Sequence, residues 1–221
     1  MYTLHASPDF ASFVVHIVLE ELGVPYKLHL LDFDAGDLQL PAHLAVNPFG
    51  KIPALQTPDG PMFETAAILL WLADRHGSLA PAPASPDRAA FLSWFSFNNF
   101  ALHAGMMDLV HAYRPAGEAN AEAVSAVAFE KLNTQLAVLN TFAARAKPDW
   151  LCPEKPSILT YHLSMLMRWM NAFPFIAAHS IKPADFPALN AILVAMEQRP
   201  AAIRAAAAEG MTGTFFSNPQ G

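Results

Sequence analysis

The segment that most restricts the fold of this chain lies at residues 47–77. Two turn-forming dipeptides, Asn-Pro and Phe-Gly, precede a short apolar segment at residues 51–55, and a Thr-Pro-Asp-Gly turn follows it. Because Pro53 cannot donate a hydrogen bond to a strand ladder, we expect either a sheet edge or a cis peptide bond there. Residues 62–63 then return as a partner strand, and a Thr-capped helix begins directly after them. The pattern predicts a β-hairpin that leads straight into a helix.

This predicted unit presents three groups that together suit one small, charged peptide. If Pro53 turns the backbone out of the sheet, the N–H and C=O of Ile52 become free to pair with an extended peptide. The start of the helix at Thr65 carries free N–H groups and a partial positive charge, which suit a carboxylate. Glu64, directly before it, suits an amino group. The segment therefore predicts a site for a short peptide that carries both a carboxylate and an ammonium group.

These motifs resemble the glutathione site of glutathione S-transferases. The shared features are the Ile-Pro strand, the turn, and Glu-Thr at the start of an Ala-Ala-Ile-Leu-Leu-Trp-Leu helix. The resemblance implies that the chain binds glutathione as a co-substrate. It also implies that five residues contact glutathione: Lys51, Ile52, Pro53, Glu64 and Thr65.

The composition predicts a folded protein and argues against several classes of function. Apolar residues make up 53% of the chain and charged residues 14%, so we expect a sizeable core, and the net charge of −6 argues against nucleic-acid binding. Cys152 is the single cysteine and the nine histidines lack the spacing of a metal site, so we expect neither a disulfide nor a metal. Residues 89–107 lack charged side chains but contain Asn and His near their middle, which favours a buried helix over a membrane span. The N-terminus shows no signal peptide, so we expect a cytoplasmic protein that does not bind a membrane.

The first part of the chain predicts a mixed α/β layer. Residues 2–6 and 24–31 have the pattern of strands, and residues 10–22 between them have the pattern of a helix that ends at Gly23. Residues 33–46 predict a loop with one helical turn. Together with the hairpin and helix described above, these elements give the order β-α-β-(α)-β-β-α of a thioredoxin-like domain.

A proline-rich linker at residues 80–86 separates this domain from an all-helical one. The apolar periodicity predicts no further strand but several helices, at residues 86–114, 120–146, 157–171 and 186–199 and in an Ala-rich segment that ends at Gly210. We therefore expect a thioredoxin-like domain at residues 1–79 and an all-α domain at residues 87–221. This order resembles the glutathione transferase architecture over residues 1–210, and bacterial beta-type members are the most similar in style.

The catalytic position is the point at which the chain departs from the family it resembles. Glutathione transferases lower the pKa of the bound thiol with a hydroxyl or N–H donor at the start of the first helix. The usual serine position falls on Asp9 and the beta-type cysteine position falls on Ala11, and neither side chain suits a thiolate. The nearest hydroxyl is Ser12, which we expect to be the catalytic residue, with Ser7 or backbone N–H groups as the alternatives.

The resemblance also implies a contribution from the helical domain. His103 stands where beta-type enzymes carry a histidine that reaches towards the active site, so we expect it to bind substrate; the alternative is a hydrogen-bonded core residue. The helical domain is expected to form the pocket for a small hydrophobic electrophile. Its apolar content and the family resemblance together imply a homodimer with twofold symmetry.

Three functions agree with these features. The first is an enzyme of detoxification that conjugates glutathione to small hydrophobic electrophiles. The second is a glutathione-binding scaffold or regulatory protein with weak or no transferase activity, which the residues at positions 9 and 11 favour. The third is a glutathione-dependent peroxidase or disulfide reductase, which needs the bound thiol but less help from the protein. We expect the first, because the family also activates the thiol with displaced hydroxyls and backbone N–H groups.

Overall fold

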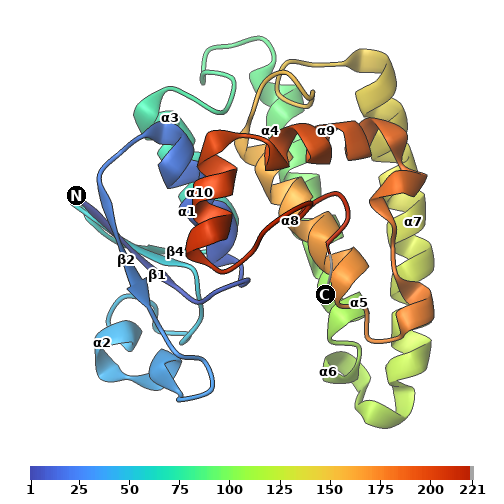
Figure 1. The fold of residues 1–221 in the computed structure, drawn as a ribbon, viewed down its shortest axis with the longest axis horizontal. Helices are drawn as coiled ribbons and strands as arrows, with labels where there is room; N and C mark the ends of the chain where they lie inside the picture. The colour runs from blue at the N-terminus through green and yellow to red at the C-terminus, as the bar shows by residue number, and fades with distance from the viewer. Residues whose placement is uncertain (220–221) are drawn as a thin grey trace. The chain divides into compact units, whose positions relative to one another are not determined.

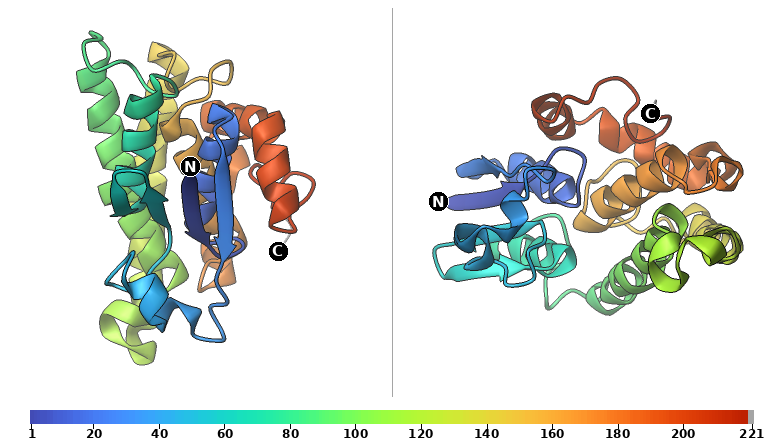
Figure 2. Two further views of the ribbon diagram at one scale, coloured as in Figure 1. Left: turned by 90° about the vertical axis from the view of Figure 1, so that its left-hand side faces the viewer. Right: turned by 90° about the horizontal axis from the view of Figure 1, so that it is seen from below.

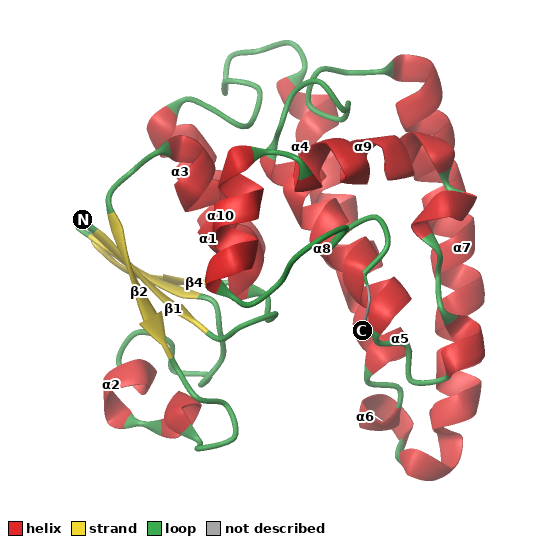
Figure 3. Cartoon of the chain, in the orientation of Figure 1, coloured by secondary structure: helices red, strands yellow, loops and turns green. Residues whose placement is uncertain are grey.

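The computed structural model describes residues 1–219 and divides the chain into two compact units. The first unit consists of Met1–Ser78 and Arg199–Thr212, and the second of Leu79–Gln198 with the described residues from Gly213 onward. Within residues 1–219 all strands belong to the first unit, as Figure 3 shows. No helix among these residues is long and apolar enough to cross a membrane.

The first unit is built on a four-stranded mixed sheet with the strand order β2-β1-β3-β4. β1 (Tyr2–Ala6) and β2 (Tyr26–Leu30) run parallel, and α1 (Ser12–Leu22) connects them. β3 (Ala54–Thr57) is antiparallel to β1, and β4 (Gly60–Phe63) is antiparallel to β3. The predicted thioredoxin-like α/β layer is therefore confirmed (Figure 1).

The predicted hairpin differs from the observed one at its first residues. The sequence pattern places a strand at residues 51–55, but β3 begins only at Ala54. The Ile52–Pro53 peptide bond is cis, which agrees with one of the two expectations for this proline. Because Pro53 has no N–H to donate, the ladder starts at the first residue that can pair on both sides.

Helices cover the sheet of the first unit and fill its core. Eight consecutive residues of α1, from Ser12 to Leu19, are buried, because the helix packs against β1, α3 (Thr65–His76) and α10 (Pro200–Ala208). Gly23 ends α1 in a left-handed conformation with φ 64°, as the sequence predicts. Two short turns, η1 (Asp37–Gln39) and α2 (Pro41–Leu44), stand where one helical turn was expected.

The structure groups α10 differently from the expected division of the chain. The sequence places residues 199–212 in the all-α domain, whereas the structure groups them with the sheet. The reason is the fit of α10 onto α1, which Figures 1 and 2 show side by side. Small buried residues such as Ala202 and Ala205 permit close approach, and Arg199 and Arg204 pair with carboxylates of α1. Otherwise the division into 1–79, 80–86 and 87–221 stays a prediction about separately folding domains.

The second unit contains helices only, among the residues that the structure describes. One helical run combines α4 (Arg88–Phe97), a π-helical turn η2 (Asn98–His103) and α5 (Ala104–Val110), so it ends earlier than the predicted residue 114. The remaining long helices agree with the sequence pattern to within two residues: α7 (Ala121–Ala146), α8 (Ile158–Ala172) and α9 (Pro187–Glu197). The short elements are α6 (Tyr113–Ala116), η3 (Glu118–Asn120), η4 (Ala177–His179) and η5 (Pro183–Asp185).

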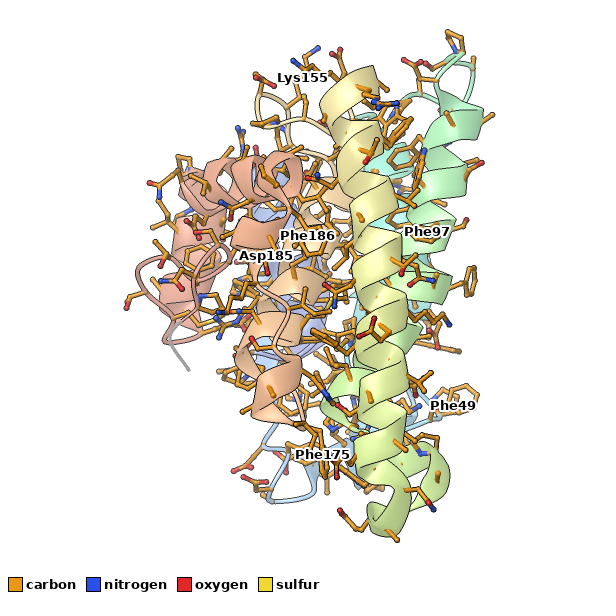
Figure 4. The ribbon with its side chains drawn as sticks, turned by 90° about the vertical axis from the view of Figure 1, so that its right-hand side faces the viewer. Phe49, Phe97, Lys155, Phe175, Asp185 and Phe186 are labelled. Atoms are coloured by element: carbon orange, nitrogen blue, oxygen red, sulfur yellow. The ribbon has the colours of Figure 1, made fainter. Side chains whose placement is uncertain are left out.

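Helix α8 forms the core of this unit, because twelve of its residues are buried and it packs against α5 and α9. Its first turn has the reciprocal hydrogen bonds of a capping box between Ser157 and Thr160. Figure 4 looks onto α7, with Phe97 and Phe186 on its two sides in that view. Phe186 is only 6% exposed, and Phe97 is half-buried.

Candidate functional site

Three segments leave the sheet of the first unit at the same end. His5 pairs with Ala54, and Ala54 pairs with Phe63. Because both pairings are antiparallel, the residues after His5, those before Ala54 and those after Phe63 emerge together. The three segments are the loop at residues 7–11, the Ile52–Pro53 pair, and Glu64 at the start of α3. The geometry thus brings five of the predicted site residues, 51–53 and 64–65, to one end of the sheet.

The peptide groups of Ile52 are not used by the fold. Neither its N–H nor its C=O has a hydrogen-bond partner among residues 1–219. In contrast, the C=O of the preceding Lys51 accepts from Asn47 Nδ2 at 2.7 Å and from His43 Nε2 at 3.2 Å. Ile52 therefore presents a free donor and a free acceptor to an extended ligand.

The loop before Ile52 is held in one position by a glycine. Gly50 has φ 58°, in the left-handed region, and its N–H donates to Asn47 C=O at 3.0 Å. A Cβ atom there would lie 2.6 Å from Gln39 Nε2 and 2.9 Å from the Leu38 carbonyl oxygen. Glycine adopts this backbone conformation without strain, and only glycine permits this close approach to η1.

The start of α3 offers a second binding group. Glu64 is the N-cap residue and has φ 71° and ψ 113°, a backbone conformation that costs a non-glycine residue about 1–3 kcal/mol. No side chain caps the helix, so its first N–H groups face outwards without an intrahelical partner. Thr65 is the first helical residue and is buried, which corrects the expectation that Thr65 itself is the cap. An uncapped N-terminus with a strained residue before it is suited to an anion.

The hydroxyl of Ser12 is engaged inside the protein. Ser12 is fully buried, and its Oγ accepts from Ser7 N–H at 3.2 Å and donates to Ser7 C=O at 3.1 Å. A serine hydroxyl has one hydrogen, so Ser12 can donate to a thiol only after it releases the Ser7 carbonyl. Its catalytic role stays a prediction.

A pocket of about 480 Å³ opens beside the loop at residues 7–11. It is lined by Ser7, Pro8, Phe10, Leu30, Leu31, Asp32, Phe33, Asp34 and Asp37. Asp32 Oδ1 accepts from the N–H groups of Asp34 and Ala35, and Asp37 Oδ2 accepts from Asp32 N–H. Two of the carboxylates therefore hold the backbone of residues 32–37 in place. The pocket is acidic, and it includes Ser7 in its wall but not Ser12.

Comparison with known proteins agrees with this geometry. The family described as "Glutathione S-transferase, N-terminal domain" matches residues 1–74. A sphingomonad glutathione S-transferase, solved in complex with glutathione, is 32% identical and superposes with a TM-score of 0.74 over 95% of this chain and 100% of that one. The chain belongs to the glutathione S-transferase family.

Two further relatives show how far the likeness to glutathione S-transferases extends. GstA of Escherichia coli O157:H7 is 27% identical over 94% of this chain and 98% of that protein. Elongation factor 1-gamma of Prunus avium is 34% identical over 57% of this chain and 32% of that protein. The chain spans from 24% to 50% of the length of the plant glutathione S-transferases of wheat, rice and maize that it matches.

The structure places His103 in the second unit of this family member, on the π-helical turn η2. Its ring lies 5.5 Å from that of His162 and 6.5 Å from that of Trp169, and burial lowers the pKa of His103 to about 4. Its imidazole has no hydrogen-bond partner in the described part of the chain, so the expected alternative of a hydrogen-bonded core residue does not fit. Nearby, the side chains of Asn98 and His162 are buried and unpaired.

Sequence reasoning assigned no role to a polar network that ends at the loop of residues 7–11. The backbone N–H of Asp9 donates to Glu209 Oε2, and Glu209 Oε1 contacts His16 Nδ1, both at 2.9 Å. His16 Nε2 lies 2.9 Å from the hydroxyl of Tyr26, which donates to Glu20 at 2.5 Å. Glu209 lies at the end of the Ala-rich segment that the sequence predicts as a helix, but no local pattern connects it to Asp9.

Proposed function

We propose that this transferase-family chain binds glutathione in the first unit, at the end of the sheet where residues 7–11, Ile52 and the start of α3 emerge. Ile52 pairs through its N–H and C=O with the cysteinyl part of glutathione, between Lys51 and Pro53. Thr65 and the free N–H groups of α3 bind a carboxylate, and Glu64 takes the ammonium group. The proposal rests on one observation: the N–H and C=O of Ile52 have no partner among residues 1–219, and they lie at the same end of the sheet as the uncapped, strained start of α3.

We further propose that the bound thiol adds to small hydrophobic electrophiles, in a detoxifying reaction. The thiol gives its proton to solvent, and its sulfur forms a bond to an electrophilic carbon. That carbon expels its leaving group, or the adduct takes up a proton. The start of α1 supplies the hydrogen bond that favours the thiolate, through Ser12 after release of Ser7, through Ser7 itself or through backbone N–H groups. A role of His103 in binding the substrate stays part of the proposal.

A second candidate function is a glutathione-binding scaffold or regulatory protein. The engaged hydroxyl of Ser12 and the carboxylates of Asp32, Asp34 and Asp37 around the pocket both disfavour an anionic sulfur nearby. The elongation-factor relative also carries a name other than a transferase. A glutathione-dependent peroxidase or disulfide reductase uses the same bound thiol and is the third candidate.

Calorimetry of glutathione binding tests the proposed site. Thr65→Ala removes a hydroxyl at the carboxylate seat and should weaken binding about fivefold to hundredfold, because an unpaired polar group costs about 1–3 kcal/mol. Thr134→Ala, the same change on the exposed face of α7, is the matched control. Unchanged affinity in Thr65→Ala would contradict the assignment of Thr65 to binding a carboxylate of glutathione.

The rate of conjugation to an activated aryl halide separates the candidate functions once binding is measured. Wild-type protein that binds glutathione and accelerates the reaction is a transferase, whereas binding without acceleration supports the scaffold. Ser12→Ala and Ser7→Ala, titrated through the ultraviolet absorbance of the thiolate, identify the donor. The variant that raises the thiol pKa by about one unit has lost it. If neither does, backbone N–H groups govern the sulfur.

We also propose that the protein is a twofold homodimer in the cytoplasm. Large apolar side chains are exposed in both units, among them Phe49 at 67% and Phe100 at 78%. Figure 4 shows Phe49 projecting outwards from its loop. Sedimentation should give a dimer at micromolar concentration, and Phe49→Ser should weaken it. A monomer at that concentration would contradict the dimer.

A further inference from the structure

The orientation of the Ile52 N–H depends on the peptide plane that Ile52 shares with Lys51. The peptide bond between the two residues is trans, so the Lys51 C=O and the Ile52 N–H point in opposite directions. Two donors, Asn47 Nδ2 and His43 Nε2, hold the Lys51 carbonyl oxygen. By fixing the carbonyl on one side of the backbone, they direct the Ile52 N–H, within the same peptide plane, to the opposite side, where it has no partner in the described part of the chain.

His43 can hold Lys51 in this way only in one tautomer. Because Nε2 must donate to the Lys51 carbonyl, Nδ1 of neutral His43 carries a lone pair. This atom lies 3.0 Å from His5 Nδ1, which therefore supplies the hydrogen between the two rings. Both rings are enclosed, since His43 is 1% exposed and His5 is 8% exposed. The strand β1 thus fixes the tautomer of a residue on α2, and that residue fixes the peptide plane at Ile52.

The two rings together have room for a single hydrogen between their Nδ1 atoms. If both imidazoles carried a proton on Nδ1, two N–H groups and two positive charges would face each other at 3.0 Å. The other titratable groups around the pair are cationic or basic: His29 on β2, with its ring 4.7 Å from that of His5, and Lys51 itself. No carboxylate forms an ion pair with His5, His29 or His43 within residues 1–219. Burial and the neighbouring histidines lower the pKa of His5 to about 4, and burial also lowers the pKa of His43.

We propose that His43, supported by His5 and Asn47, is a positioning residue for glutathione binding. His43 holds the Ile52 peptide group in the binding orientation and releases it when both His5 and His43 carry a proton on Nδ1. The inference rests on the proposed glutathione site. It predicts a loss of affinity in acid that comes from the protein, because Ile52 is then no longer held in the binding orientation. It also separates His43 from the residues that touch glutathione.

Calorimetric titrations with glutathione at several pH values test the proposal on the full chain. Wild-type affinity should fall about twofold by pH 4, where the lowered pKa of His5 lies, and about tenfold by pH 3, because only the fraction of the protein that holds Ile52 can bind. His43→Gln keeps an N–H donor near Lys51 but does not titrate, so it should bind within about twofold of wild type near neutral pH, with a flatter pH profile. His43→Leu lacks the donor and should bind about fivefold to tenfold more weakly at neutral pH. His76→Asn, an exposed change in the same unit, is the matched control and should retain the wild-type profile.

Two results would overturn the proposal: a His43→Gln profile as steep as the wild-type profile, or wild-type affinity in His43→Leu. The ¹⁵N shift of the Ile52 amide, followed against pH without glutathione, gives a second readout that does not depend on binding. It should change together with the His43 ring signals in the wild type and stay flat in His43→Gln. If glutathione does not bind but the amide follows His43, the proposed function fails while the positioning stands; an amide that ignores His43 overturns the positioning itself.

Discussion

The backbone N–H of Asp9 donates a 2.9 Å hydrogen bond to Glu209 Oε2, across 200 positions of the sequence. Asp9 has φ 57°, in the left-handed region that only a few non-glycine residues adopt. Glu209 also binds His16 on α1 through its other oxygen. One buried carboxylate at the end of α10 therefore fixes both the loop that should face the glutathione sulfur and the helix that follows it.

Glu209→Gln should destabilise the protein by about 1–3 kcal/mol. The amide keeps the shape of the side chain but removes its negative charge and one acceptor oxygen, so the hydrogen bonds to Asp9 N–H and His16 lose their charge-assisted strength. Urea unfolding of the variant measures the change. Glu130→Gln, an exposed change on α7, should stay within about 0.5 kcal/mol of wild type. Equal effects of the two substitutions would contradict the role of Glu209.

Ser12→Ala should reduce stability by a similar amount, about 1–3 kcal/mol. The substitution leaves the N–H of Ser7 without its partner and removes one of the two donors to the Ser7 C=O, which still accepts from Phe10 N–H, in a place that water does not reach. Ser93→Ala is the control, because the Ser93 hydroxyl bonds to its own helix at an exposed position. If chemical denaturation gives the same midpoint for both variants, the buried pair of hydrogen bonds contributes little.

The free energy of unfolding should fall as the pH drops from 6.5 towards 4. Burial lowers the pKa of His103 to about 4, and it lowers the pKa of fully buried His162 as well. The unfolded chain therefore binds protons first, so the contribution of the neutral histidines is complete above pH 6.5 and disappears by the folded-state pKa. His103→Phe should remove up to about 3 kcal/mol of this dependence. Denaturation at both pH values checks it, and an unchanged slope in the variant would contradict the assignment to His103.

Ser157→Ala should cost about 0.5–2 kcal/mol, because it removes the cap of the central helix α8. Ser157 Oγ accepts from Thr160 N–H at 3.1 Å and donates to Trp150 C=O at 2.8 Å. Thr160→Ser keeps the reciprocal hydroxyl and should lose less stability than Ser157→Ala. Thermal unfolding that ranks the two variants in the opposite order would count against the capping box.

The sequence alone determined the elements whose signals are local. The turn after β3, the glycine that ends α1 and the irregular backbone at Pro53, for which a sheet edge or a cis bond was expected, all depend on residues a few positions apart. The order of these elements then indicated the thioredoxin-like layer and the helical unit, and with them the family. Such patterns are legible because a turn, a cap or a periodicity is set by the conformational preferences of neighbouring residues.

Only the tertiary structure decided which polar groups meet. The hydroxyl of Ser12 was expected to face a thiol, but its hydrogen goes to Ser7, and no pattern predicts which way a buried hydroxyl turns. The pairs His5–His43 and Asp9–Glu209 join residues 38 and 200 positions apart. Helix α10 packs on α1 in the first unit, although the helices that directly precede it in the sequence belong to the second unit. Contacts of this kind depend on how the chain folds back on itself, because each buried polar group must find a partner wherever the packing brings one.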